Sequence, residues 1–149
     1  MLSKEIVYQE LSRVIEDRII RIQTSISDSQ NAMKRETKST AGDKHETGRA
    51  MAQLEQEKLG KQLINNIQLR EGLSRIDMTK HHTSIAFGSF IQTNMGYFFL
   101  SVGIGQIKVN NIEVFCMTAS TPLGRTLLGK KISDTVELNG RKFEILDLK

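Results

Sequence analysis

The stretch from Ser3 to Glu36 contains neither proline nor glycine, and its apolar residues recur at three- and four-residue steps. This spacing is typical of an α-helix with one apolar stripe. At 1.5 Å per residue the helix is on the order of 50 Å long, much longer than the core of a small domain needs. A second long element must therefore cover the stripe, whose residues are Leu11, Ile15, Ile19, Ile22, Ile26 and Met33.

A second run of similar length, from about Asp43 to Ile76, can supply that element. Gly60 and Gly72 each weaken this helix by roughly 1 kcal/mol. A short polar turn joins the two runs, so we expect an antiparallel coiled-coil hairpin whose tip lies near residues 38–46. The candidate inward positions of the second helix are Met51, Leu54, Leu59, Leu63, Ile67, Leu73 and Ile76.

After Asp77 the pattern changes to short runs of Ile, Phe, Tyr and Val divided by Gly and Asn, which are strand and turn signals. Asn110-Asn111 and Asn139-Gly140 predict two tight hairpins, Asn-Gly being the preferred type I′ turn. Pro122 favours the start of a short helix, after a Ser120 or Thr121 cap and ending at Gly129. The expected strands cover residues 83–92, 96–102, 106–109, 112–118, 134–138 and 141–148.

These elements predict an α+β fold. Residues 1–79 form the coiled-coil hairpin, and residues 80–149 form a small antiparallel β-sheet with one short helix packed against it. About 70 residues is marginal for a separate core. The candidate core residues of this second part are Phe87, Phe98, Phe115, Leu127, Val136, Phe143 and Ile145.

The composition, 38% hydrophobic and 26% charged, is that of a soluble globular chain. No stretch approaches the roughly 20 apolar residues that span a bilayer, and the N-terminus lacks the apolar core of a signal peptide, so we expect a cytoplasmic protein with no membrane partner. The net charge of +4 is spread along the chain, whereas groove-binding proteins concentrate Lys and Arg on one surface. Cys116 is the only cysteine, which excludes a disulfide framework and a cysteine-rich zinc site.

Two carboxylates mark the predicted tip. Asp43 and Glu46 stand three residues apart on the first turn of the second helix, where side chains at i and i+3 share one face and can meet a common cation. The alternative is a capping box, with Asp43 as the N-cap and Glu46 at the third helical position. His45, His81 and His82 lack metal-ligand spacing, and we interpret them as surface residues.

Two motifs carry a resemblance to a known family. Gly42-Asp43-x-x-Glu46 lies at the tip of the long hairpin, and Ser120 to Lys130 reads Ser-Thr-Pro-Leu-Gly-Arg-Thr-Leu-Leu-Gly-Lys before Asp134-x-Val136. This combination resembles the bacterial Gre transcript-cleavage factors over nearly the whole chain. The run after Ser120 is the more specific of the two motifs.

The resemblance implies a monomeric accessory factor that is not itself an enzyme. Its FKBP-like C-terminal domain would bind RNA polymerase at the rim of the secondary channel, and its hairpin would enter that channel. Asp43 and Glu46 would then act at the polymerase active site, sharing a transiently bound Mg²⁺ and orienting a water, so that the polymerase cleaves the 3′ end of a backtracked RNA. The partner contacts implied in the C-terminal domain are Ser120, Pro122 and Leu123.

Elementary chemistry agrees with these roles. Two metals about 4 Å apart favour in-line phosphodiester hydrolysis, and Mg²⁺ is commonly held through one or two carboxylates. Lys38, Lys44 and Arg49 around the tip would offset carboxylate repulsion or contact RNA phosphates.

The chain also departs from the family pattern. Thr121 is inserted between Ser120 and Pro122, Ser133 stands where a glycine is usual, and Thr47-Gly48-Arg49 replaces Asn-Ala-Glu. A cleavage-silent regulator of the same channel is therefore an alternative. A third class is an independent enzyme, either a prolyl isomerase or a thiol acyl-transferase that uses Cys116; Cys116 otherwise reads as a buried hydrophobe within a strand.

Overall fold

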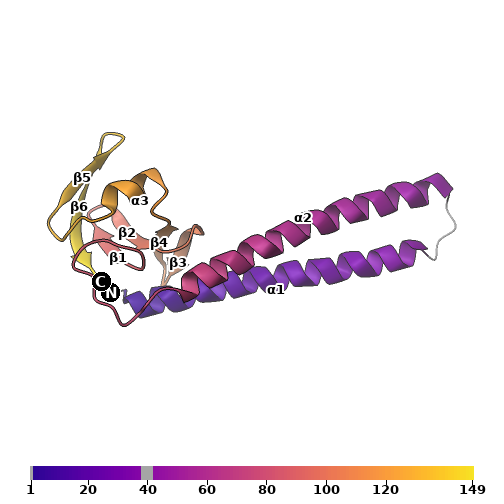
Figure 1. Ribbon diagram of the computed structural model, residues 1–149, viewed down its shortest axis with the longest axis horizontal. Helices are drawn as coiled ribbons and strands as arrows, with labels where there is room; N and C mark the ends of the chain where they lie inside the picture. The colour runs from indigo at the N-terminus through magenta and orange to yellow at the C-terminus, as the bar shows by residue number, and fades with distance from the viewer. Residues whose placement is uncertain (1, 38–41) are drawn as a thin grey trace. The chain divides into compact units, whose positions relative to one another are not determined.

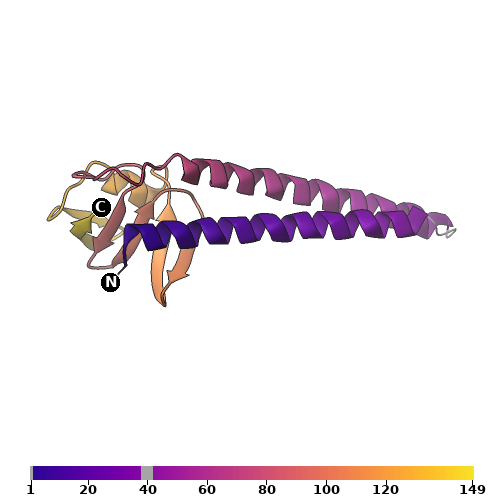
Figure 2. The ribbon, with the colours of Figure 1, turned by 90° about the horizontal axis from the view of Figure 1, so that it is seen from below.

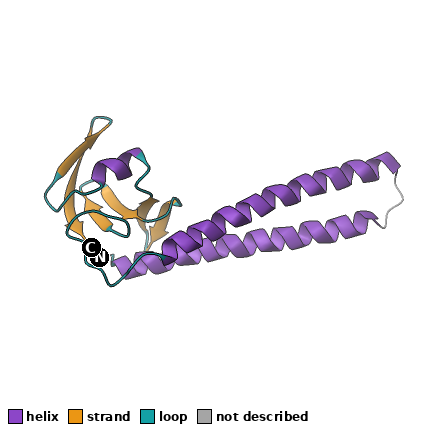
Figure 3. Cartoon of the chain, viewed as in Figure 1, coloured by secondary structure: helices purple, strands orange, loops and turns teal. Residues whose placement is uncertain are grey.

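The computed structural model describes residues 2–37 and 42–149, with the backbone alone for residues 36, 37 and 42–46. Two long helices come first, α1 (Lys4–Thr37) and α2 (Gly42–Ser74), and are followed by six strands and one short helix (Figure 1). Figure 3 shows the division between a purely helical first half and a strand-rich second half. The predicted order of elements is confirmed, and the predicted tip includes residues 38–41, which lie outside the described residues.

The chain divides into two compact units, and the division falls within the two long helices. One unit is Val14–Arg70, the larger part of α1 and α2. The other combines Met1–Arg13 with Glu71–Lys149, so that the first turns of α1 and the end of α2 belong with the sheet. This division follows packing, whereas the predicted boundary between residues 79 and 80 follows the change in sequence pattern.

In the helical unit, α1 and α2 run side by side in both ribbon views (Figure 1, Figure 2). The predicted stripe of α1 is confirmed, since Ile15 and Ile19 are buried and the later stripe residues are half-buried. Arg70 Nη1 lies 3.4 Å from Glu16 Oε1 and links the two helices. Both side chains are about half exposed, so this ion pair adds little stability.

The predicted inward face of α2 is wrong in its first half. Leu59 is buried, but Met51 and Leu54 are each 66% exposed. At about 100° per residue, Leu54 lies about 140° around the helix from Leu59, whereas Ala52, seven residues before Leu59, lies within about 20° of it. Ala52 is half-buried, as are Gly48 and Gln56. Small and polar residues therefore form the inward face there.

The sheet has the strand order β3-β4-β2-β1-β6-β5. Both predicted Asn-containing hairpins are present: β3 joins β4 through Asn110 and Asn111, and β5 joins β6 through Asn139 and Gly140, all four with positive φ. One pairing, β2 with β4, is parallel, so the sheet is mixed and not wholly antiparallel as predicted. The strands are β1 (Phe90–Thr93), β2 (Gly96–Leu100), β3 (Gly105–Val109), β4 (Ile112–Met117), β5 (Thr135–Leu138) and β6 (Arg141–Leu148).

One core cluster lies between the sheet and α3 (Pro122–Leu127). Five predicted core residues belong to it: Phe98, Leu127, Val136, Phe143 and Ile145. The prediction is wrong for two others, because Phe87 is 47% and Phe115 is 45% exposed. Phe87 precedes the sheet, whose first strand begins only at Phe90. Phe115 has the exposed Gln106 as its partner on the edge strand β3, so no apolar side chain covers it from that side.

Residues that alternate with this cluster, such as Phe99 and Val114, are also fully buried. Successive residues of a strand point to opposite faces, so the sheet is covered on both sides. Apolar residues of the same unit at the start of α1 and the end of α2 are buried as well: Leu2, Val7, Leu11, Leu73 and Ile76. A Cβ on Gly72 would lie 3.0 Å from Val102, and one on Gly88 would lie 2.9 Å from Ile76, which marks tight packing between these helix ends and the sheet domain.

Among the described residues, no helix is apolar over enough of its length to cross a membrane.

Candidate functional site

The predicted tip carboxylates both lie near the start of α2. The helix begins at Gly42, so Asp43 and Glu46 have helical backbone and occupy positions i and i+3, which share one face of the helix. Their side chains, and that of Lys44, are outside the described part of the chain, as is the whole of Lys38.

The helical backbone of Asp43 bears on the capping interpretation. A cap residue precedes the first helical residue, whereas Asp43 is the second residue of α2. A carboxylate in the first turn still interacts favourably with the partial positive charge of the helix N-terminus, by about 0.3–1 kcal/mol. Asp43 therefore suits the helix start, and its role as a cap stays a prediction because its side chain lies outside the described part of the chain.

Arg49 follows Glu46 by three residues and is exposed on α2. Arg49 is therefore a surface neighbour of Glu46, whereas positions 43 and 49, six residues apart, lie about 120° from each other around the helix. Arg49 adds a positive charge about one turn beyond Glu46.

The second predicted contact region is the start of α3. Thr121 is the N-cap: its Oγ1 accepts a hydrogen bond from Gly124 N at 3.1 Å and donates one to Thr118 O at 2.9 Å. Ser120 and Pro122, two of the predicted contact residues, are exposed. Leu123 is half-buried and packs against the core cluster, so its side chain supports the helix from beneath.

Three exposed residues lie on α3 and directly after it. Pro122 and Arg125 are at i and i+3 of the helix, and Leu128 is its C-cap residue, exposed by 48%. We call these three residues the α3 face. Backbone hydrogen bonds of 2.8 Å, from Gly129 N to Ile85 O and from Ile85 N to Lys130 O, hold the segment before β1 against the end of α3.

The enzyme alternatives find little support in the titratable groups. Burial raises the pKa of the Cys116 thiol to about 12, so the thiol is protonated at neutral pH and is not a nucleophile. His81 is exposed and His82 half-buried, and burial together with Lys4 and Lys80 lowers the pKa of His82. Within the described residues, no cluster of three or more His, Cys, Asp or Glu side chains could hold a metal.

Sequence reasoning missed Lys4. Its residue is only 3% exposed, and its Nζ has no hydrogen-bond partner among the described residues. A signal for this was present, because Lys4 precedes Leu11 by seven residues and Ile15 by eleven and therefore continues the apolar stripe of α1. A charged residue at an inward position of such a stripe indicates a buried charge.

The fold and these two regions define a class: a long two-helix hairpin with acidic residues at the start of its second helix, joined to an α+β domain. No protein-family model matches the chain, and no curated protein matches it. Among solved structures the chain is similar to the transcription factor Gfh1, with 18% sequence identity over 95% of this chain and 92% of that one and a TM-score of 0.32. The fold described above rests on the chain's own element order and sheet topology.

Proposed function

We propose that this chain is a Gre-like transcription factor that binds RNA polymerase and presents the start of α2 to the polymerase active site, stimulating cleavage of backtracked RNA. The observation that carries the proposal is the position of Asp43 and Glu46, at i and i+3 in the first turns of the second of two long helices. The Gre-like run from Ser120 to Lys130, which forms the capped helix α3, supports it independently.

The residue types fit a role in Mg²⁺ recruitment. Mg²⁺ prefers hard oxygen ligands and keeps several of its waters, so two carboxylates suffice for a transient site shared with the polymerase. When bound, the ion would supply charge stabilisation and an activated water for phosphodiester hydrolysis. The task of Asp43 and Glu46 is to offer anionic oxygens, and the task of the α2 backbone is to hold those two positions on one face.

The test is a transcript-cleavage assay on backtracked polymerase complexes, with the parent chain, Asp43→Asn and Glu46→Gln. We expect each amide variant to lower stimulated cleavage by an order of magnitude or more, because a neutral amide replaces an anionic ligand. Binding to polymerase should persist. Glu55→Gln, on the exposed side of the same helix, is the matched control and should cleave like the parent. Equal cleavage by all four proteins would refute the role of the carboxylates.

One observation favours the alternative, a cleavage-silent channel regulator. Arg49 stands one turn after Glu46 on α2, at a position where the family resemblance leads us to expect a glutamate. A cation at that place competes with a metal for the Glu46 carboxylate. Arg49→Glu therefore separates the two functions: if the parent does not stimulate cleavage and the variant does, the parent is a regulator silenced by Arg49. If the parent already stimulates cleavage, the regulator alternative is wrong.

For polymerase docking we propose the α3 face, together with Ser120. It combines two exposed apolar side chains with one cation, a composition suited to a protein partner. In a pull-down of core polymerase, Leu128→Ser should weaken binding severalfold. Leu146→Ser is the matched control, because Leu146 is 46% exposed on β6 and is not part of that face. Equal weakening by both variants would argue against α3 as the docking surface.

A further inference from the structure

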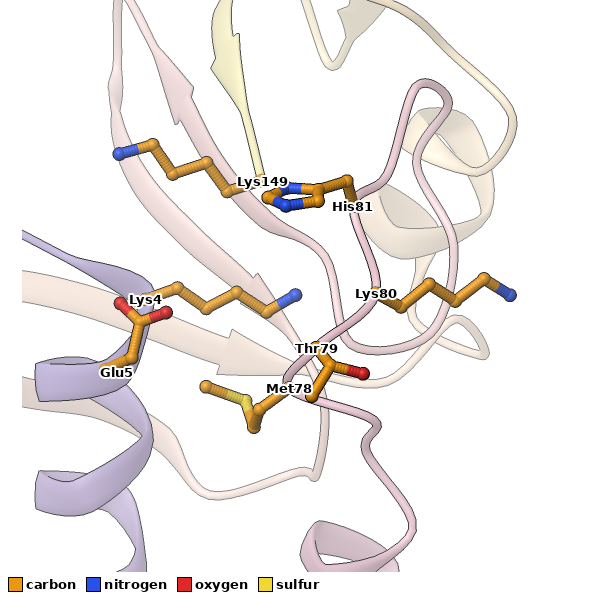
Figure 4. Close-up of a pocket in the computed structure, with 7 residues that line it drawn as sticks. All are labelled: Lys4, Glu5, Met78, Thr79, Lys80, His81 and Lys149. Atoms are coloured by element: carbon orange, nitrogen blue, oxygen red, sulfur yellow. The ribbon is translucent and has the colours of Figure 1, made fainter.

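A pocket of about 420 Å³ lies at the N-terminal end of α1, within the unit that contains the sheet (Figure 4). Its lining comes from the first residues of α1, from residues 78–81, and from Lys149. The volume falls in the range of small-molecule sites, roughly 300–1,000 Å³. Neither the tip carboxylates nor the α3 face contributes to it.

Lys4 lies at the floor of this pocket. Figure 4 shows its side chain extending from α1 toward residues 79–81, with the ring of His81 on the opposite side of the space and the ammonium groups of Lys80 and Lys149 directed away. Lys4 is 97% buried, since only 3% of its surface is exposed. An ammonium taken out of water without a partner costs several kcal/mol, so the group needs a counter-ion.

The two nearest carboxylates do not supply that counter-ion. Asp77 accepts hydrogen bonds from Thr79 N at 3.0 Å and from Thr79 Oγ1 at 2.6 Å, and Glu5 is an exposed residue of the first turn. Neither forms an ion pair with Lys4 within the part of the chain that the structure describes. Burial lowers the pKa of Lys4, and the negative charges of Glu5 and Asp77 offset this effect only in part, as expected for an ammonium that has lost water without a directly paired anion.

The backbone adds positive potential at the same place. α1 is 34 residues long and begins at Lys4, so its N-terminal partial positive charge is directed at the pocket. Ser3 accepts hydrogen bonds from two backbone N–H groups of the first turn: Ile6 N donates to Ser3 Oγ at 3.2 Å, and Val7 N donates to Ser3 O at 3.2 Å. The N–H groups of Lys4 and Glu5 precede the first possible intrahelical bonds. A helix N-terminus beside a cationic side chain is a common anion site.

We propose that this pocket binds the phosphate group of a small anion, with the Lys4 ammonium at its floor as the principal ligand and the N-terminus of α1 and His81 as supporting groups. Phosphate suits the site because its several acceptor oxygens can reach an ammonium, a ring N–H and backbone amides at once. The charged and titratable groups around the pocket are Lys4, Lys80, His81, His82 and Lys149 against Glu5, Asp77 and the α-carboxylate of Lys149. The three ammonium groups are balanced by three carboxylates, so the proposal depends on the buried position of Lys4 and not on an excess of positive charge. The inference goes beyond the proposed transcription function and stands without it.

The test is an NMR titration of the full ¹⁵N-labelled chain with inorganic phosphate and, separately, with ATP, against sodium chloride at matched ionic strength. We expect saturable shifts at residues 4–6 and 78–81 that chloride does not produce. Tighter binding of ATP than of inorganic phosphate identifies a nucleotide as the preferred source, and equal or weaker binding identifies free phosphate. The inference would be overturned if neither anion, at up to about 10 mM, caused a saturable shift beyond the shift that chloride causes. A site that does not saturate at that concentration binds more weakly than the millimolar affinity that corresponds to about 4 kcal/mol.

Variants separate the pocket from general attraction by a basic surface. Lys4→Met keeps the volume of the side chain and removes its charge, and should weaken phosphate binding at least tenfold. Lys108→Met, at an exposed position on β3, should not change it. Should Lys4→Met fail to fold, His81→Gln, an exposed loop position, takes its place and should weaken binding severalfold. Unchanged affinity in the folded pocket variant would refute the site, whatever the outcome of the polymerase assays.

Discussion

Of the glycines whose surroundings the structure describes, Gly124 is the one where adding a single methyl group should disturb the structure most. A Cβ built on it would lie 2.2 Å from Thr118 O, 2.8 Å from Thr121 Oγ1 and 3.1 Å from the Cα of Ala119. Two of these neighbours are backbone atoms, and the third is the cap hydroxyl itself. Because Thr118 O also accepts the hydrogen bond from Thr121 Oγ1 at 2.9 Å, the carbonyl cannot turn away without breaking the cap.

Gly124→Ala must therefore move α3 outward by about 1 Å to reach an ordinary carbon–oxygen contact. That shift stretches the hydrogen bond from Gly124 N to Thr121 Oγ1 and lifts Leu127, which is fully buried, from the core. Overpacking costs about 1–3 kcal/mol and loss of a Thr cap about 1 kcal/mol. We expect a total destabilisation of about 2–4 kcal/mol, with weaker polymerase binding because the α3 face moves.

The chain offers its own probe for this measurement. It has no Trp, and both Tyr residues, Tyr8 and Tyr97, belong to the unit that contains the sheet. Urea unfolding followed by tyrosine fluorescence therefore reports on that unit. Gly60→Ala is the control with the opposite sign: nothing lies within 4 Å of its Cβ position, and in a helix Ala is about 1 kcal/mol better than Gly. Because Gly60 belongs to the helical unit, which contains no tyrosine, its unfolding is followed by the helical circular dichroism signal. A Gly124→Ala free energy of unfolding within about 0.5 kcal/mol of the parent would refute the steric reasoning.

Three further predictions concern single side chains. Ser133 has φ +77°, a conformation that costs a non-glycine residue about 1–2 kcal/mol, and its N–H donates to Ile145 O at 2.8 Å. Ser133→Gly keeps this hydrogen bond and should raise the free energy of unfolding in urea by about 0.5–1 kcal/mol, once the added entropy of the unfolded chain is subtracted. A lower unfolding midpoint would contradict the strain argument. The pKa of Lys4 is lower in the folded state than in the unfolded state, so the unfolded chain binds more protons and stability should rise with pH between the two pKa values. Lys4→Met should flatten that rise. An unchanged pH profile of stability in the variant would count against the buried ammonium. Cys116 should resist iodoacetamide at pH 8 in the native protein and react in urea, because burial raises its pKa to about 12; rapid labelling of the native protein would contradict its burial.

The parts of the fold that sequence predicted correctly are those fixed by local chemistry. Asn110, Asn111, Asn139 and Gly140 all have positive φ because a two-residue type I′ turn requires it, and Asn and Gly tolerate that conformation best. The start of α3 follows in the same way from Pro122, whose fixed φ suits a first helical turn, and from the hydroxyl before it. Sequence left open whether Ser120 or Thr121 caps α3. The structure assigns the cap to Thr121, the residue inserted relative to the family pattern.

The parts that sequence did not predict depend on partners distant in the chain. A pattern of apolar residues gives the period of a helix, but which residues face the neighbouring helix depends on that neighbour, and in α2 the half-buried Gly48, Ala52 and Gln56 face inward in place of Met51 and Leu54. The parallel pairing of β2 with β4 has the same origin. The β3–β4 hairpin can be predicted from its turn residues. Which of its two strands pairs with β2 depends on the packing of the whole sheet, and in the structure it is β4.

The same distinction explains the candidate sites. Asp43 and Glu46 could be proposed from a motif because their relation is local: three residues along one helix place both on one face, whatever surrounds them. The Lys4 pocket needed the fold, because residues 78–81 and Lys149 reach the start of α1 only through the packing of the sheet domain. Lys4 also shows why stability alone does not explain the sequence. A Met at that position would continue the apolar stripe and remove a buried charge, a replacement that is often neutral or stabilising. An ammonium retained at the floor of a pocket, with no internal partner among the described residues, is instead what binding of an anion requires.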